Sequence, residues 1–117
     1  MKYLLLIYGN EKAMASATPE STKQIVTAYH AYTAALRESG SYIAGEALQP
    51  TATATAIRGA GSAAKVTDGP FAETREQLGG FYMVDTPDLD GAIAWARRCP
   101  GTEFRTVEVR PVWTIPS

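Results

Sequence analysis

The sequence contains a single cysteine and a single histidine in 117 residues. Cys99 alone cannot form an internal disulfide, which fits a reducing cytoplasm. His30 and Cys99 lie far apart in the chain, so they do not provide the closely spaced ligands of a metal site. The Gly59-x-Gly61 spacing lacks the strand and helix that surround a phosphate-binding loop. We therefore expect no metal and no cofactor.

Charge and long apolar runs are equally limited. The 11 Lys and Arg residues oppose 12 Asp and Glu residues, and no segment concentrates the basic ones. This argues against direct binding to nucleic acid, which needs a basic surface. The apolar run from Tyr3 to Tyr8 is shorter than the ~7–15 residues of a signal-peptide core and far below the ~20 residues of a membrane span. We expect a cytoplasmic protein with no membrane segment.

The remaining composition is that of an ordinary folded domain. Hydrophobic residues make up 45% of the chain and charged residues 20%, which is typical of globular proteins. The length fits one domain, so we expect a single domain over residues 1–117.

Local signals predict two helices and several strands. Thr18-Pro19-Glu20 is a helix start, with a hydroxyl N-cap, a proline at the first helical position and a carboxylate in the first turn. Apolar residues recur at helical spacing up to Gly40, a predicted left-handed cap. Thr86-Pro87-Asp88 repeats the pattern before a shorter helix. The predicted strands are Tyr3–Tyr8, Tyr42–Leu48, Thr51–Arg58, Ala63–Thr67, Gly79–Asp85 and Thr106–Val112, and Gly9–Ala17 is predicted to be a loop.

The order of these elements is β-α-β, an inserted β-hairpin, and again β-α-β. This order is typical of the ferredoxin-like split βαβ, an α+β fold in which two helices cover one face of an antiparallel sheet. The other face would remain in water, which is unfavourable for an apolar surface. We therefore expect a homodimer whose sheets pack face to face as a dimeric α+β barrel, with a cleft near the interface.

The turn Asp68-Gly69-Pro70-Phe71 follows the predicted hairpin and is the strongest candidate for a site. Gly69 can reach a positive φ, and Pro70 fixes its own φ and has no N–H, so the turn can hold Asp68 in a set direction. Asp68 could act as a base or orient a partner. Alternatively, its side chain accepts hydrogen bonds from backbone N–H groups of the turn. Phe71 could stack on a planar ligand.

Other candidates lie on both sides of this turn. Glu73 and Arg75 form either a solvated loop or part of a site, where Arg75 would bind an anionic substrate. Histidine is the side chain best suited to acid–base work near neutrality, and His30 lies about 100° from the apolar face of its helix, so it could line a cleft or lie on the surface. Tyr29 and Tyr82 are either core residues or hydroxyl donors to a ligand.

Five segments of the sequence resemble one family. They are MKYLLLIYG at the N-terminus, GEAL at 45–48, TDGPFAETREQLGGFYMVD at 67–85, PDLDGAIAWA at 87–96 and VEVRPV at 107–112. Together they resemble the YCII-related family, and more narrowly its DGPF-motif branch. The resemblance covers nearly the whole chain in order, and it implies a dimeric α+β barrel.

The resemblance also implies functions. The broad family is thought to be enzymatic through a His and an Asp in its cleft, and it includes a dehydrochlorinase of chlorinated aromatic breakdown. By this resemblance Asp68 is a plausible site carboxylate, and the family's helix histidine corresponds to His30 or to Tyr29. DGPF proteins are also associated with extracytoplasmic-function sigma factors, which implies a regulatory role.

Three interpretations follow. The first is a small cofactor-independent enzyme, a lyase or isomerase that moves protons on a small planar substrate. Its catalytic residues would be Asp68 and His30, and its substrate-binding residues Tyr29, Gly69, Pro70, Phe71, Glu73, Arg75 and Tyr82. The second is a non-catalytic module that binds a small ligand or a sigma factor. In the third, the Asp68 turn only closes the hairpin and stabilises the dimer.

Overall fold

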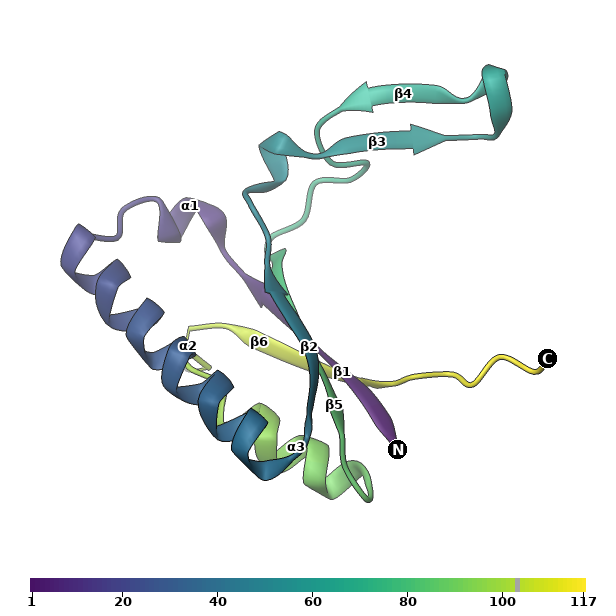
Figure 1. Ribbon diagram of the computed structural model, residues 1–117. Coiled ribbons are helices and arrows are strands. Elements are labelled where there is room, and N and C mark those ends of the chain that lie inside the picture. The colour runs from purple at the N-terminus through teal and green to yellow at the C-terminus, as the bar shows by residue number, and fades with distance from the viewer. Residues whose placement is uncertain (103) are drawn as a thin grey trace.

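The computed structural model describes residues 1–102 and 104–117. Its helices are α1 (Glu11–Met14), α2 (Pro19–Ser39) and α3 (Leu89–Arg98), and short 3₁₀ turns lie at Thr51–Thr53 and Gly61–Ala63. Its strands are β1 (Lys2–Gly9), β2 (Tyr42–Ala47), β3 (Thr55–Arg58), β4 (Lys65–Asp68), β5 (Gln77–Asp85) and β6 (Thr106–Pro111) (Figure 1). None of the described helices is long and apolar enough to span a membrane.

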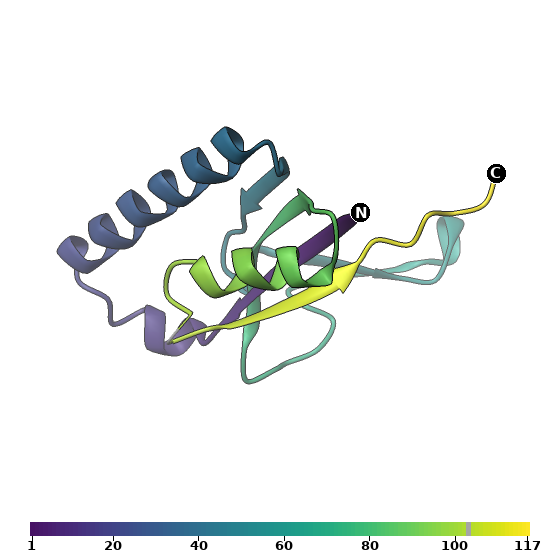
Figure 2. The ribbon, with the colours of Figure 1, turned by 90° about the horizontal axis from the view of Figure 1, so that it is seen from below.

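The main sheet has four strands in the order β2-β5-β1-β6, and each neighbouring pair is antiparallel. Both long helices pack on the same face of this sheet, as Figures 1 and 2 show from two sides. The hydrophobic core between these helices and the sheet consists of Tyr3, Leu5, Ile7, Tyr32, Leu36, Tyr82, Val84, Ala92, Ala96 and Cys99. This arrangement confirms the predicted ferredoxin-like α+β fold.

Helix α2 begins and ends where the sequence predicts. The Thr18 hydroxyl accepts a hydrogen bond of 3.1 Å from the backbone N–H of Ser21, which satisfies one of the free donors of the first turn. Gly40 ends the helix with φ of 80°, a conformation that favours glycine. Tyr32 and Leu36 are buried against the sheet, so the predicted apolar face is confirmed.

Two predictions near the N-terminal half are wrong. Residues 11–14 are not loop but helix α1, because the Asn10 side chain accepts a hydrogen bond of 3.1 Å from Ala13 N–H and caps it. The predicted strand from Thr51 starts only at Thr55. The reason is the Glu11 carboxylate, which accepts hydrogen bonds of 2.8 Å from both the backbone N–H and the hydroxyl of Thr51.

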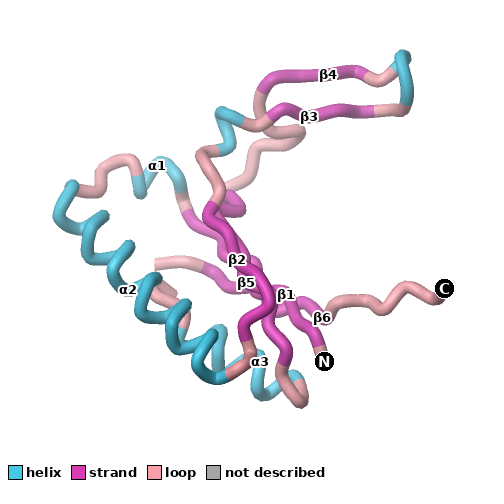
Figure 3. The backbone as a smooth tube through the Cα atoms, viewed as in Figure 1, coloured by secondary structure: helices cyan, strands magenta, loops and turns pink. Residues whose placement is uncertain are grey.

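The hairpin of β3 and β4 is a separate two-stranded sheet that extends away from the main layer (Figures 1 and 3). The hairpin is confirmed, with Thr55 opposite Asp68 at its base and Arg58 opposite Lys65 near its tip. Ile57 lies directly opposite Val66, and both side chains are more than 60% exposed.

The centre of the second face of the main sheet is also apolar, and charged residues flank it on the last strand, where Arg110 lies opposite Leu4 and Glu108 opposite Leu6. Leu4 pairs with Met83, and Leu6 pairs with Phe81, so these four side chains form neighbouring cross-strand pairs. They alternate along the strands with core residues, and they therefore lie on the face that α2 and α3 do not cover. The homodimer predicted from such a face stays a prediction.

Candidate functional site

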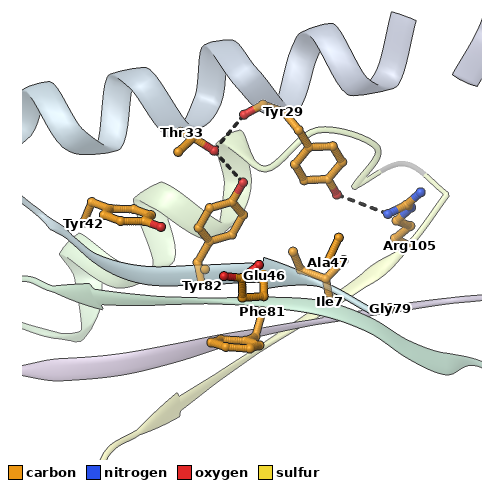
Figure 4. Close-up of a pocket in the computed structure, with 12 residues that line it drawn as sticks. Ile7, Tyr29, Thr33, Tyr42, Glu46, Ala47, Gly79, Phe81, Tyr82 and Arg105 are labelled. Atoms are coloured by element: carbon orange, nitrogen blue, oxygen red, sulfur yellow. Dashed lines mark hydrogen bonds between the residues drawn. The ribbon is translucent and has the colours of Figure 1, made fainter. Parts of the chain in front are cut away.

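A pocket of about 220 Å³ lies between α2 and the main sheet (Figure 4). Helix α2 contributes Tyr29 and Thr33, and Tyr82 rises toward them from β5. Tyr42 lies at one end and Arg105, directly before β6, at the other. The full lining is Ile7, Tyr29, Thr33, Tyr42, Gly45, Glu46, Ala47, Gly79, Gly80, Phe81, Tyr82 and Arg105.

Gly45 in β2 makes room for the Tyr82 ring, and Gly80 in β5 allows the close approach of the β2 backbone. A Cβ on Gly45 would lie 2.6 Å from Cδ1 and 2.9 Å from Cε1 of Tyr82, which is closer than these atoms can approach. A Cβ on Gly80 would lie 3.0 Å from the backbone oxygen of Glu46. The GEAL and GGFY segments of the sequence therefore form the floor of the pocket.

Tyr82 and Thr33 connect the sheet to α2. The Thr33 hydroxyl donates to the backbone oxygen of Tyr29 at 2.8 Å, and it lies 2.7 Å from the Tyr82 hydroxyl. The Tyr82 ring is also held edge-on by Tyr32 at 5.3 Å and by Tyr42 at 6.4 Å between ring centroids. Burial raises the pKa of Tyr82, so its hydroxyl stays protonated at neutral pH.

Tyr29 holds Arg105 at the other end of the pocket. The Tyr29 hydroxyl donates to the backbone oxygen of Pro100 at 3.1 Å and accepts from Nη1 of Arg105 at 3.2 Å. Burial, and then the neighbouring thiol of Cys99, raises the pKa of Tyr29. Arg105 is half-buried, and neither ion pair found in the described part of the chain includes it. The pocket thus carries one cationic group, with further N–H donors available to a ligand.

The structure brings only two of the predicted site residues into this pocket, Tyr29 and Tyr82. His30 follows Tyr29 but is exposed, because one helical step turns it away from the sheet. The other predicted residues lie in or after the exposed turn that follows β4 and do not line the pocket: Asp68, Gly69, Pro70, Phe71, Glu73 and Arg75.

The Asp68 turn is held by its backbone. Gly69 has φ of 96°, as its sequence predicts, and its N–H donates to the backbone oxygen of Ala54 at 2.6 Å. The hydrogen bonds found across residues 1–102 and 104–117 include none to the Asp68 carboxylate, so the predicted side-chain cap of this turn is not formed. Phe71 is 92% exposed and, with Pro70, borders a groove of about 300 Å³ on the hairpin.

Sequence reasoning missed Thr33, Tyr42, Gly45 and Arg105. Thr33 follows Tyr29 by four residues, and this helical spacing could have identified it. Arg105 has no comparable signal. It reaches the pocket because β6 pairs with β1, a contact between opposite ends of the chain.

No group of three or more His, Cys, Asp or Glu side chains within the described residues is close enough to hold a metal ion. The lining of the pocket combines hydroxyl groups, aromatic rings, one guanidinium and one acidic residue, Glu46.

Comparison with known proteins gives the family. The family model described as the YCII-related domain matches residues 1–116. An uncharacterized protein of Rhizobium meliloti (strain 1021) is 34% identical over 114 residues, which cover 96% of this chain and 92% of that protein. The chain belongs to the family of proteins with a YCII-related domain.

Proposed function

We propose that the protein binds a small planar molecule in the pocket between α2 and the main sheet. The observation that supports this is the lining, in which the rings of Tyr29 and Tyr82 face a space with polar groups at both ends. Its volume of about 220 Å³ limits the ligand to a small molecule. A cavity of about 150 Å³ is enough for benzene in another protein, so one substituted ring is a suitable size.

The finer form of this proposal is a cofactor-independent lyase or isomerase. Burial raises the pKa of Tyr29 and Tyr82, so within one chain their hydroxyl groups and the Arg105 guanidinium position a substrate and stabilise negative charge rather than act as bases. The base would be Asp68, with His30 as its acid–base partner. Since both are exposed and outside the pocket of their own chain, this mechanism requires a second copy of the chain to supply Asp68 and His30.

A homodimer is therefore part of the proposal. Its interface would be the uncovered sheet face with Leu4, Leu6, Phe81 and Met83, four apolar side chains on adjacent strands. Sedimentation at micromolar concentration should give the mass of a dimer, and L4E should give a monomer that remains folded. A monomeric wild-type protein would contradict the interface.

Ligand binding can be tested independently of catalysis. Isothermal titration calorimetry with benzoate and phenol measures binding to the wild type and to A47F, whose ring would fill the pocket. The matched control is A34F, because Ala34 is exposed on α2 and does not line the pocket. Equal binding by both variants would place the site elsewhere.

The sigma-factor association implied by the resemblance stays a prediction, for which co-purification with that factor is the test.

A further inference from the structure

The hydroxyl groups of Thr33 and Tyr82 have no proton left for a ligand. Thr33 carries one hydroxyl proton, which it donates to the backbone oxygen of Tyr29. Tyr82 must then be the donor in the contact of 2.7 Å between the Thr33 and Tyr82 hydroxyl groups. What remains on the Tyr82 hydroxyl is a lone pair, so this hydroxyl can accept a hydrogen bond from a ligand but cannot donate one.

The Arg105 end has the opposite character. The Tyr29 proton is donated to Pro100, and the Tyr29 oxygen accepts from Arg105. Tyr29 therefore fixes the guanidinium without neutralising it. Arginine has five N–H donors in a planar fork that fits a carboxylate with two parallel hydrogen bonds. This end of the pocket donates and is cationic.

We infer that the ligand is a hydroxylated aromatic acid, whose carboxylate pairs with Arg105 and whose hydroxyl donates to Tyr82. The inference rests on the proposed binding function of the pocket. This inference predicts that the pocket binds the hydroxyl form of a ligand more tightly than the methoxy form. The shape of the pocket alone would not predict this difference, which arises because the ether oxygen of a methoxy group has no proton to donate. A methoxy ligand leaves the lone pair of the hydroxyl of Tyr82, a buried residue, without a partner, which is unfavourable.

The probes are 3- and 4-hydroxybenzoate, the corresponding methoxybenzoates and the corresponding hydroxybenzamides, titrated into the full chain by calorimetry. One hydroxybenzoate isomer should bind about tenfold more tightly than its methoxy analogue, and about tenfold more tightly than its amide. Y82F should reduce the preference for hydroxyl over methoxy to about one. R105Q should instead remove the preference for carboxylate over amide. R110Q, at an exposed arginine that pairs with Glu108, should keep both preferences.

Thr33→Val provides a second and independent test. This substitution removes the oxygen that accepts the hydroxyl proton of Tyr82, so Tyr82 can donate this proton to the ligand instead. The methoxy analogue should therefore gain affinity relative to the hydroxybenzoate. Binding of the probes with equal affinities for hydroxyl and methoxy analogues would overturn this inference and leave the proposed function intact. Failure of every probe to bind the wild type would overturn the proposed function, and this inference with it.

Discussion

Gly45→Ala tests whether the Tyr82 ring is fixed by the strand beneath it. The added Cβ would lie 2.6 Å from the ring, and an ordinary contact needs at least 3.4 Å, so the ring would have to move by about 0.8 Å. The rings of Tyr32 and Tyr42 and the hydrogen bond to Thr33 oppose this movement. Overpacking of this kind costs about 1–3 kcal/mol. Replacing glycine by alanine in a strand gains about 0.5–1 kcal/mol, so the net loss should be about 0–2.5 kcal/mol.

Urea unfolding followed by circular dichroism measures this loss. Gly79→Ala is the matched control, because its Cβ would meet nothing closer than the Ile7 oxygen at 3.8 Å, and it should be neutral or stabilising. In a Tyr82→Leu background the cost of Gly45→Ala should become smaller, since the clashing ring is absent and only the contact of 3.2 Å with the Phe81 backbone oxygen remains. Equal stability of the Gly45 and Gly79 variants, or an undiminished cost in the Tyr82→Leu background, would refute the explanation.

Further predictions concern pH, the hairpin and the turn. Burial raises the pKa of Tyr29 and Tyr32, so above the ordinary value of 10.0 the unfolded chain loses protons that the folded chain keeps. The free energy of unfolding should therefore fall as pH rises above about 10. Unfolding curves measured at alkaline pH test this, and a free energy of unfolding that does not change with pH would contradict it. Glu11→Ala removes both hydrogen bonds to Thr51 and should cost about 1–3 kcal/mol in urea unfolding, with a smaller loss for Glu11→Gln, which keeps one acceptor oxygen. No loss for Glu11→Ala would contradict the stabilising role of this contact. Asp68→Ala should change the free energy of unfolding by less than about 0.5 kcal/mol, because the described structure shows no hydrogen bond to this carboxylate, and a larger loss in thermal unfolding would support the structural interpretation of the turn.

The fold was largely predictable because its signals are local. The caps at Thr18 and Gly40 and the apolar run of β1 each depend on neighbouring residues, and element order then selects the ferredoxin-like plan. Helix α1 was missed although Asn10 is a good N-cap, since four residues carry too little apolar periodicity to identify a helix. The late start of β3 was not predictable, because it depends on a contact between Glu11 and Thr51, 40 residues apart.

The candidate site was less predictable, because it depends on which strands become neighbours. Tyr29 and Tyr82 were identified as either core residues or hydroxyl donors to a ligand, but the reason they meet is the packing of α2 over β5. Arg105 enters the pocket only through the pairing of the first and last strands. The emphasis on Asp68 came from the constrained turn, and that turn does lie in the predicted conformation, yet on the hairpin rather than beside the pocket.

The positions of Asp68 and the pocket favour a second copy over a movement of the hairpin. For Asp68 to reach the pocket of its own chain, the whole β3–β4 sheet would have to turn, because the bond from Gly69 to Ala54 ties the turn to the base of the hairpin. Both connections of the hairpin are held by Glu11: its carboxylate binds Thr51 before the hairpin, and its N–H donates at 2.9 Å to the Gln77 side chain after it. An isolated two-stranded sheet is marginally stable in water, and its exposed Ile57–Val66 pair would gain from burial. Contact with a second copy would stabilise this hairpin without breaking the bonds that hold it in place, and it is therefore the less costly way to bring Asp68 to a pocket.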